Sequence, residues 1–128
     1  MTVPRQTFSS GYPFEKSYGY ARTVRVGDHV FVSGTTARLT ELEGDAYVQL
    51  TAAIKLVATS LREAGADLTH VVRTVVYVID LEDAHKVAQA HAEAFGASLP
   101  ASTLVQVSAL TPPSARVEIE VTAIVHDS

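Results

Sequence analysis

The chain has no cysteine among its 128 residues. Disulfides, thiolate metal sites and a cysteine nucleophile are therefore excluded. Charged residues make up only 19% of the sequence, a low fraction that indicates a surface partly covered by another molecule. The formal net charge of −4 argues against nucleic acid as a partner, because phosphate binding favours a net basic face.

Several motifs of common chemistries are also missing. The sequence has no Walker-type or Gly-x-Gly-x-x-Gly loop and no Gly-x-Ser-x-Gly elbow, so neither a nucleotide cofactor nor a hydrolase of that type is expected. No apolar run approaches the ~20 residues of a membrane span, and the start of the chain lacks a signal-peptide pattern. We therefore expect a cytoplasmic protein with no membrane partner.

The five histidines do not group into a metal site. His85 and His91 lie six residues apart on one predicted helix, about 240° around its axis, and cannot share a metal. His91 falls on the apolar stripe of that helix, where a hydrogen-bonded and partly buried histidine is the ordinary finding. We expect neither a metal nor another cofactor.

The length fits a single domain over residues 1–128 in which strands and helices alternate. The first sixteen residues, with two prolines and a glycine, indicate an irregular arm. The later elements are expected in the order ββαβαββ: strands over 20–26 and 30–33, a helix from Asp45 to Gly65, a strand over 70–79, a helix from Asp80 to Gly96, and strands over 101–107 and 116–124.

The predicted strand over 71–79 is apolar on both faces. Period two places Val72, Val76 and Val78 on one face, and Val71, Val75, Tyr77 and Ile79 on the other. Two amphipathic helices can cover only one face of a sheet, so the second face must meet another subunit. The sequence thus predicts a two-layer α/β domain, with two helices on one face of its sheet, that assembles into an oligomer.

The last strand separates apolar from polar side chains. Glu118, Glu120 and Thr122 alternate with apolar residues, so the two carboxylates are expected to point away from the helices. This pattern fits a solvated face, an ion pair between subunits, or a reactive site. Ser33-Gly34 ends an earlier strand where a ligand can approach the backbone closely, although a bulge before a loop explains the pair equally well.

Six short segments in a fixed order carry a family resemblance. They are GYARTVRVG over 19–27, VFVSG over 30–34, AGADLTHVVRT over 64–74, VYVID over 76–80, PAST over 100–103 and VEIE over 117–120. From about residue 18 to residue 124 the chain resembles the Rid family, the YjgF-type reactive-intermediate deaminases. The resemblance implies a chorismate-mutase-like fold with a mixed, mostly antiparallel sheet, assembled as a homotrimer with a small-molecule cleft at each subunit interface.

The resemblance also implies an activity, the cofactor-independent hydrolysis of imines or enamines to a keto acid and ammonia. Glu118 stands at the family's water-activating glutamate, Tyr20 at its pocket tyrosine, and Ser33-Gly34 at its Ser-Gly backbone. Ser102 replaces the arginine that follows Pro-Ala and binds the substrate carboxylate, and Ala88 replaces an asparagine. A serine hydroxyl cannot substitute for a bidentate guanidinium, so simple α-imino acids are not the expected substrates unless another cation binds them.

Arg22 is one source of that cation. It lies two residues from Tyr20 and on the same face of its strand, so it either reaches the cleft or pairs with Glu15 or another acid. Leu104, two residues beyond Ser102, is expected to share the face of Ser102.

The first functional hypothesis is a hydrolase or deaminase of a small imine, enamine or related conjugated metabolite. Glu118 would be its catalytic base, and the substrate would contact Tyr20, Arg22, Ser33, Gly34, Ser102 and Leu104. The alternative is a non-catalytic, small-molecule-binding or chaperone-like trimer that has lost the chemistry. An endoribonuclease is the weakest alternative, because the chain is acidic.

Overall fold

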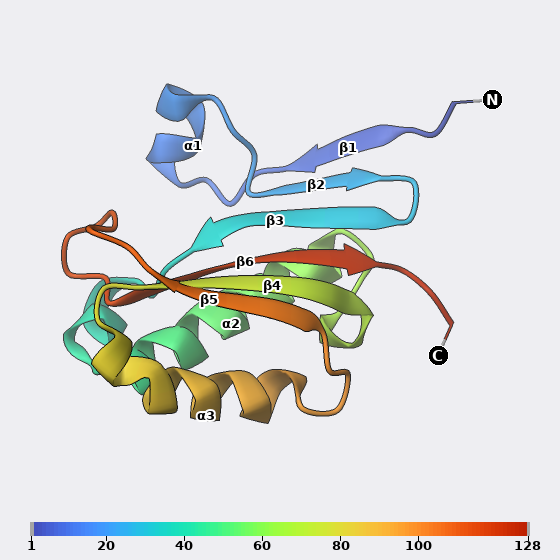
Figure 1. The fold of residues 1–128 in the computed structure, drawn as a ribbon. Coiled ribbons are helices and arrows are strands. Elements are labelled where there is room, and N and C mark those ends of the chain that lie inside the picture. The colour runs from blue at the N-terminus through green and yellow to red at the C-terminus, as the bar shows by residue number, and fades with distance from the viewer. Residues whose placement is uncertain (1, 128) are drawn as a thin grey trace.

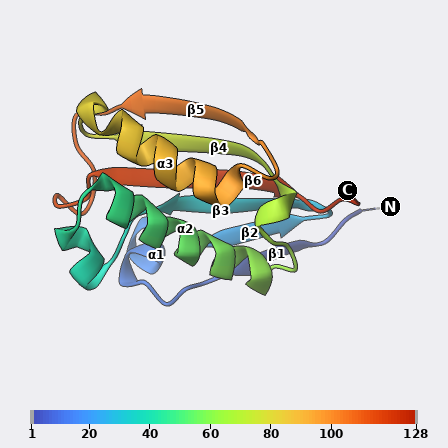
Figure 2. The ribbon, with the colours of Figure 1, turned by 90° about the horizontal axis from the view of Figure 1, so that it is seen from below.

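The computed structural model describes residues 2–127, which form one six-stranded sheet with two long helices on one face (Figures 1 and 2). The strand order is β1-β2-β3-β6-β4-β5, and all neighbours are antiparallel except β4 and β5. The predicted two-layer α/β class with a mixed, mostly antiparallel sheet is confirmed. The elements are β1 Arg5–Phe8, α1 Pro13–Tyr18, β2 Thr23–Val26, β3 His29–Thr35, α2 Ala46–Glu63, β4 Val71–Val78, α3 Ala84–Phe95, β5 Ala101–Gln106 and β6 Val117–Ile124.

Helix α2 follows its sequence signals closely. The Asp45 side chain accepts a hydrogen bond from the Val48 amide and so satisfies one of the free N–H groups at the helix start. Gly65, at φ +83°, follows the last turn in the left-handed conformation that ends many helices. The predicted apolar stripe is confirmed as buried: Leu50, Ile54, Val57 and Leu61.

Helix α3 differs from its prediction in the face that it buries. Asp80 caps the short 3-10 turn Leu81–Asp83 that precedes α3, not α3 itself. The spacing predicts a buried stripe of Ala84, Ala88, His91 and Phe95. Phe95 is buried and Ala84 and His91 are half-buried, but Ala88 is exposed, and Val87 and Ala90 are buried instead. The reason is the position of α3 beside the sheet edge, where its other side borders a pocket next to β5.

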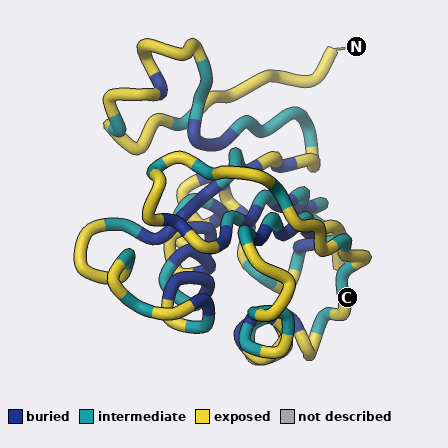
Figure 3. The backbone as a smooth tube through the Cα atoms, turned by 60° about the vertical axis from the view of Figure 1, so that its left-hand side comes forward, coloured by how far each residue is buried: buried dark blue, intermediate teal, exposed yellow. Residues whose placement is uncertain are grey.

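The core lies between the sheet and the two helices. In β6, Val117, Ile119, Val121 and Ala123 are at most 3% exposed, and the intervening side chains face the other way. Figure 3 shows the buried positions concentrated along α2 and the central strands. One alternation in β4 was predicted wrongly: the register shifts between Val71 and Arg73, and this irregularity turns Val71 into the core.

Neither α2 nor α3 covers the opposite face of the sheet; within residues 2–127 the short helix α1 lies on that side, beside the end of β3 (Figure 1). Phe31 on β3 and Val105 on β5, both on that face by strand alternation, are 44% and 37% exposed. A second subunit on this face therefore remains a prediction.

The arm over residues 1–16 is not irregular throughout, as the sequence had indicated. It contains β1, which pairs with β2, and the short helix α1. Pro13 at the first helical position and Gly19, at φ +88° after the last, define that helix. The arm brings its aromatic residues to the end of β3, where they form one wall of a pocket.

Within residues 2–127, no helix combines the length and the apolar character that crossing a membrane requires.

Candidate functional site

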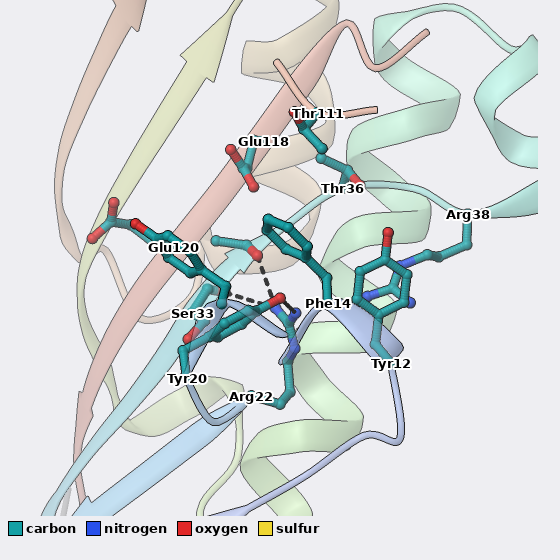
Figure 4. Close-up of a pocket in the computed structure, with 12 residues that line it drawn as sticks. Tyr12, Phe14, Tyr20, Arg22, Ser33, Thr36, Arg38, Thr111, Glu118 and Glu120 are labelled. Atoms are coloured by element: carbon teal, nitrogen blue, oxygen red, sulfur yellow. Dashed lines mark hydrogen bonds between the residues drawn. The ribbon is translucent and has the colours of Figure 1, made fainter. Parts of the chain in front are cut away.

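A pocket of about 370 Å³ lies on the side of the sheet toward which Glu118 and Glu120 point, away from α2 and α3 (Figure 4). We call it the Glu118 pocket. The arm supplies one wall, the end of β3 and the following loop a second, and β6 the floor. Its lining residues are Tyr12, Phe14, Tyr18, Tyr20, Arg22, Ser33, Gly34, Thr36, Arg38, Thr111, Glu118 and Glu120.

The Glu118 carboxylate is half-buried in this pocket and accepts no hydrogen bond from any residue between 2 and 127. Burial raises the pKa of Glu118, the positive charge of Arg22 lowers it, and the negative charge of Glu120 raises it further, with a net increase. A carboxylate with free lone pairs and a raised pKa is suited to hold and deprotonate a water molecule.

Gly34 makes room for this carboxylate. A Cβ atom at position 34 would lie 2.8 Å from Glu118 Oε2 and 3.0 Å from Glu118 Cδ, closer than real side chains approach. The absence of a side chain at Gly34 therefore permits Glu118 to lie against the backbone of β3.

The guanidinium of Arg22 lies beneath the pocket, 5% exposed. Its NH1 nitrogen donates to the Gly34 carbonyl at 2.8 Å and to Thr35 Oγ1 at 3.1 Å, and its NH2 nitrogen donates to the Tyr20 hydroxyl at 3.0 Å. Its Nε atom is 3.5 Å from Glu15 Oε2. The pairing with Glu15, one of the two alternatives for Arg22, is therefore present, but in a buried setting rather than on the surface.

Glu15 balances the charge of Arg22. Burial acts to raise the pKa of Glu15, but hydrogen bonds from Ser10 and Ser9 together with the charge of Arg22 outweigh it, and the net pKa is lowered. Glu15 thus stays ionised next to the guanidinium. The second carboxylate of the pocket, Glu120, is also engaged, because the Tyr77 hydroxyl donates a hydrogen bond to it.

Aromatic rings from the arm form the outer wall of the pocket. Phe14 stacks on Tyr18 with ring centroids 5.4 Å apart, and both meet Tyr20 edge-on, at 6.2 and 5.8 Å. On the side of the pocket away from Glu120, the guanidinium carbon of Arg38 lies 4.1 Å from the centroid of the Tyr12 ring (Figure 4).

Two of the predicted site residues lie elsewhere. Ser102 and Leu104 pair with Thr74 and Val76, whose buried side chains point toward the helices, so they face away from Glu118. They line a second pocket of about 370 Å³ between α3 and β5, which we call the Ser102 pocket. Within one chain the structure brings together Tyr20, Arg22, Ser33, Gly34 and Glu118, but not Ser102 and Leu104.

The Ser102 pocket is mainly apolar, with a chain of neutral polar groups on one wall. The Thr74 hydroxyl donates to Ser102 Oγ at 2.6 Å, and His91 Nε2 lies 2.8 Å from Thr74 Oγ1. Burial lowers the pKa of His91, so its ring is neutral at neutral pH. His91 is therefore the hydrogen-bonded, partly buried histidine that the sequence indicated.

Comparisons with known proteins identify the family. The family model described as Endoribonuclease L-PSP matches residues 13–125. A crystal structure from Mycobacterium tuberculosis, a member of the highly conserved YjgF/YER057c/UK114 family, is 41% identical with a TM-score of 0.89, covering 95% of this chain and 100% of that one. The chain belongs to the YjgF (Rid) family. The resemblance that the six segments carried is confirmed.

Two further YjgF relatives cover most of the chain. A human protein named 2-iminobutanoate/2-iminopropanoate deaminase is 30% identical over 112 residues, covering 88% of this chain and 80% of its own. An uncharacterized protein of Streptomyces coelicolor is 37% identical over 117 residues, covering 89% of this chain and 87% of its own.

Sequence reasoning missed part of the pocket of this YjgF-family chain, namely Tyr12, Phe14, Tyr18 and Arg38. A signal was present, because four of the chain's nine aromatic residues (five tyrosines and four phenylalanines) fall between positions 12 and 20. No comparable signal marked Arg38, which lies in a loop. Within residues 2–127, no three His, Asp or Glu side chains are grouped so that they could hold a metal ion.

Proposed function

We propose that this chain hydrolyses a small imine or enamine in the Glu118 pocket without a cofactor. Glu118 is the observation that carries the proposal: its carboxylate is half-buried, burial raises its pKa, and no residue between 2 and 127 hydrogen-bonds to it. Perturbed carboxylates of this kind cluster at sites of acid–base chemistry. The human relative named as an imine deaminase gives further support.

In the proposed reaction, water adds to the carbon of a protonated C=N bond. Glu118 takes one proton from the water as the C–O bond forms, and the π electrons of the C=N bond become the nitrogen lone pair. Glu118 then returns the proton to nitrogen and the C–N bond breaks. The oxygen lone pair forms the C=O bond, and the hydroxyl proton passes to the departing ammonia, which leaves as ammonium.

A homotrimer is part of the proposal. Neither α2 nor α3 covers the sheet face that carries Glu118, and Phe31 and Val105 are exposed on that face. Ser102 and Leu104 point to the opposite face, so one chain cannot present them to its own Glu118. A second copy would have to bring its Ser102 pocket to the Glu118 pocket, forming the cleft between subunits. Light scattering should give a trimer mass, compared with 13.7 kDa for one chain.

The activity is tested with 2-iminopropanoate and 2-iminobutanoate generated in situ, by following the release of ammonia and keto acid. Glu118→Gln keeps the shape of the side chain and removes the base, so we expect turnover to fall by ~10²–10⁴-fold. Glu120→Gln is the matched control on the same strand and face, and a smaller loss is expected because Tyr77 already engages Glu120. A folded Glu118→Gln protein with full activity would contradict the mechanism.

The Ser102 pocket favours a second candidate, a trimer that binds a small molecule without turning it over. Ala88 and Ser102, at the positions of the family's asparagine and arginine, both line this pocket, and no lysine or arginine lines it. A non-catalytic binding trimer predicts no turnover on a broad panel of imines by the wild-type chain, together with saturable binding of one of them.

A further inference from the structure

We propose that Arg38 binds the carboxylate of the ligand in the Glu118 pocket. The pocket would then select a small molecule with an imine or carbonyl group at one end and a carboxylate at the other. This inference rests on the proposed function, because it names the substrate class of the same site. Ser102 stands where the family has its carboxylate-binding arginine, and the proposal gives that role to a residue outside the Pro-Ala segment.

Two arginines line the pocket, and Arg22 is not available for this role. Its terminal nitrogens already donate to the carbonyl groups of Ser33 and Gly34, to Thr35 and to the Tyr20 hydroxyl. Its charge is balanced by Glu15, 3.5 Å from its Nε atom. Redirecting Arg22 to a ligand would leave these buried acceptors without donors, which is costly.

Arg38 is in the opposite situation. Between residues 2 and 127 its guanidinium has no ion pair and no hydrogen-bonded acceptor. Only its stacking position is fixed, with the guanidinium carbon 4.1 Å from the centre of the Tyr12 ring. Stacking holds the plane of the guanidinium while its N–H groups remain free, and that planar fork matches the two oxygens of a carboxylate.

The charges of the pocket fix the direction of the ligand. Glu118 and Glu120 repel an anionic group and attract a protonated imine. In Figure 4 Arg38 enters beside Tyr12, on the side of the pocket away from Glu120. A ligand with its carboxylate on Arg38 therefore extends its cationic end toward Glu118, where the water would react. The aromatic wall between them, Phe14 and Tyr20, takes the apolar part.

The test measures binding of 5-oxohexanoate, a keto acid whose carbonyl and carboxylate groups are separated by a short apolar chain, to the full chain by NMR titration, so it does not depend on turnover. We expect Arg38→Met to weaken this binding by roughly tenfold to a hundredfold, the effect of removing a charged hydrogen-bonding partner. Arg38→Lys should restore part of the loss, since an ammonium group keeps the charge but not the fork. Arg62→Met, at an exposed position of α2, is the matched control and should bind like wild type.

The methyl ester of 5-oxohexanoate has no negative charge and should bind wild type and Arg38→Met equally. The proposal is overturned if the acid binds both proteins equally, or if wild type does not bind it. Each of these results leaves the hydrolysis proposal standing, because that proposal is decided by the Glu118→Gln assay. Conversely, absent turnover with Arg38-dependent binding of the acid would reject the hydrolysis alone.

Discussion

The Glu118 pocket and the Ser102 pocket lie on opposite faces of one sheet and have the same volume, about 370 Å³, but they treat charge differently. The first keeps ionisable groups and compensates them: burial raises the pKa of Glu118, and Arg22 opposes that increase. The second removes charge, because burial lowers the pKa of His91 with no opposing partner. Reactive polar chemistry therefore fits the first pocket, and an apolar group fits the second.

The largest expected effect comes from breaking the charge compensation below the Glu118 pocket. Arg22→Met leaves the buried Glu15 carboxylate and the acceptors at Ser33 and Gly34 without their cation. Breaking a buried ion pair from one side costs about 3–5 kcal/mol, so the free energy of unfolding should fall by that amount in denaturant titrations. Arg62→Met serves as the exposed control. Equal losses of unfolding free energy in the two variants would show that the Arg22–Glu15 charge pair does not stabilise the pocket.

A smaller effect is expected in the Ser102 pocket, where polarity resides in hydroxyl groups. Thr74→Val removes the fully buried hydroxyl that links Ser102 to His91. The unpaired groups should lower the free energy of unfolding by about 1–2 kcal/mol. Thr59→Val, at an exposed position of α2, should change little. Unchanged stability of Thr74→Val would mean that this chain of hydroxyl groups does not stabilise the pocket.

The smallest expected effect is an increase in the free energy of unfolding, where the two preceding substitutions lower it, and it depends on pH. The pKa of Glu118 is raised in the folded chain, so the protonated form is favoured there. Its contribution to stability is fully present below the unfolded pKa, about 4.3, and is lost as the pH rises through the folded value. The free energy of unfolding of Glu118→Gln should therefore match that of wild type in acid and exceed it at neutral pH. Chemical denaturation across this pH range provides the measurement, and a constant difference between the two proteins would refute the assignment.

The helices and strands with a strong periodic pattern could be predicted from the sequence, and the Glu118 pocket could be predicted in part. Alternation in β6 placed Glu118 away from the helices, and the three- and four-residue spacing in α2 predicted its buried stripe. Ser33-Gly34 was noted as a place of close approach, but the atom that approaches, Glu118 Oε2, comes from a strand that is distant in sequence. Such a contact depends on the sheet order, which the local pattern does not contain.

Two features escaped sequence reasoning for different physical reasons. Strand β5 is exposed or half-exposed along its length, so its pattern did not reveal that Ser102 and Leu104 point away from Glu118. The arm has elements of only four and six residues, too short for a periodic signal, although Pro13 and Gly19 mark the ends of α1. Arg38 was missed because a loop residue has no face to predict.

The close approach of Gly34 to Glu118 has a consequence for how this sequence can change. Even an alanine at position 34 would place its Cβ 2.8 Å from Glu118 Oε2, so the identity of one residue restricts the other. The two positions should therefore be coupled: the contacting atoms are the flexible end of Glu118, so a side chain at position 34 would displace the carboxylate from its place against β3. Substitutions at the two sites should not be additive, and the pocket cannot lose its glycine first and keep its glutamate in place.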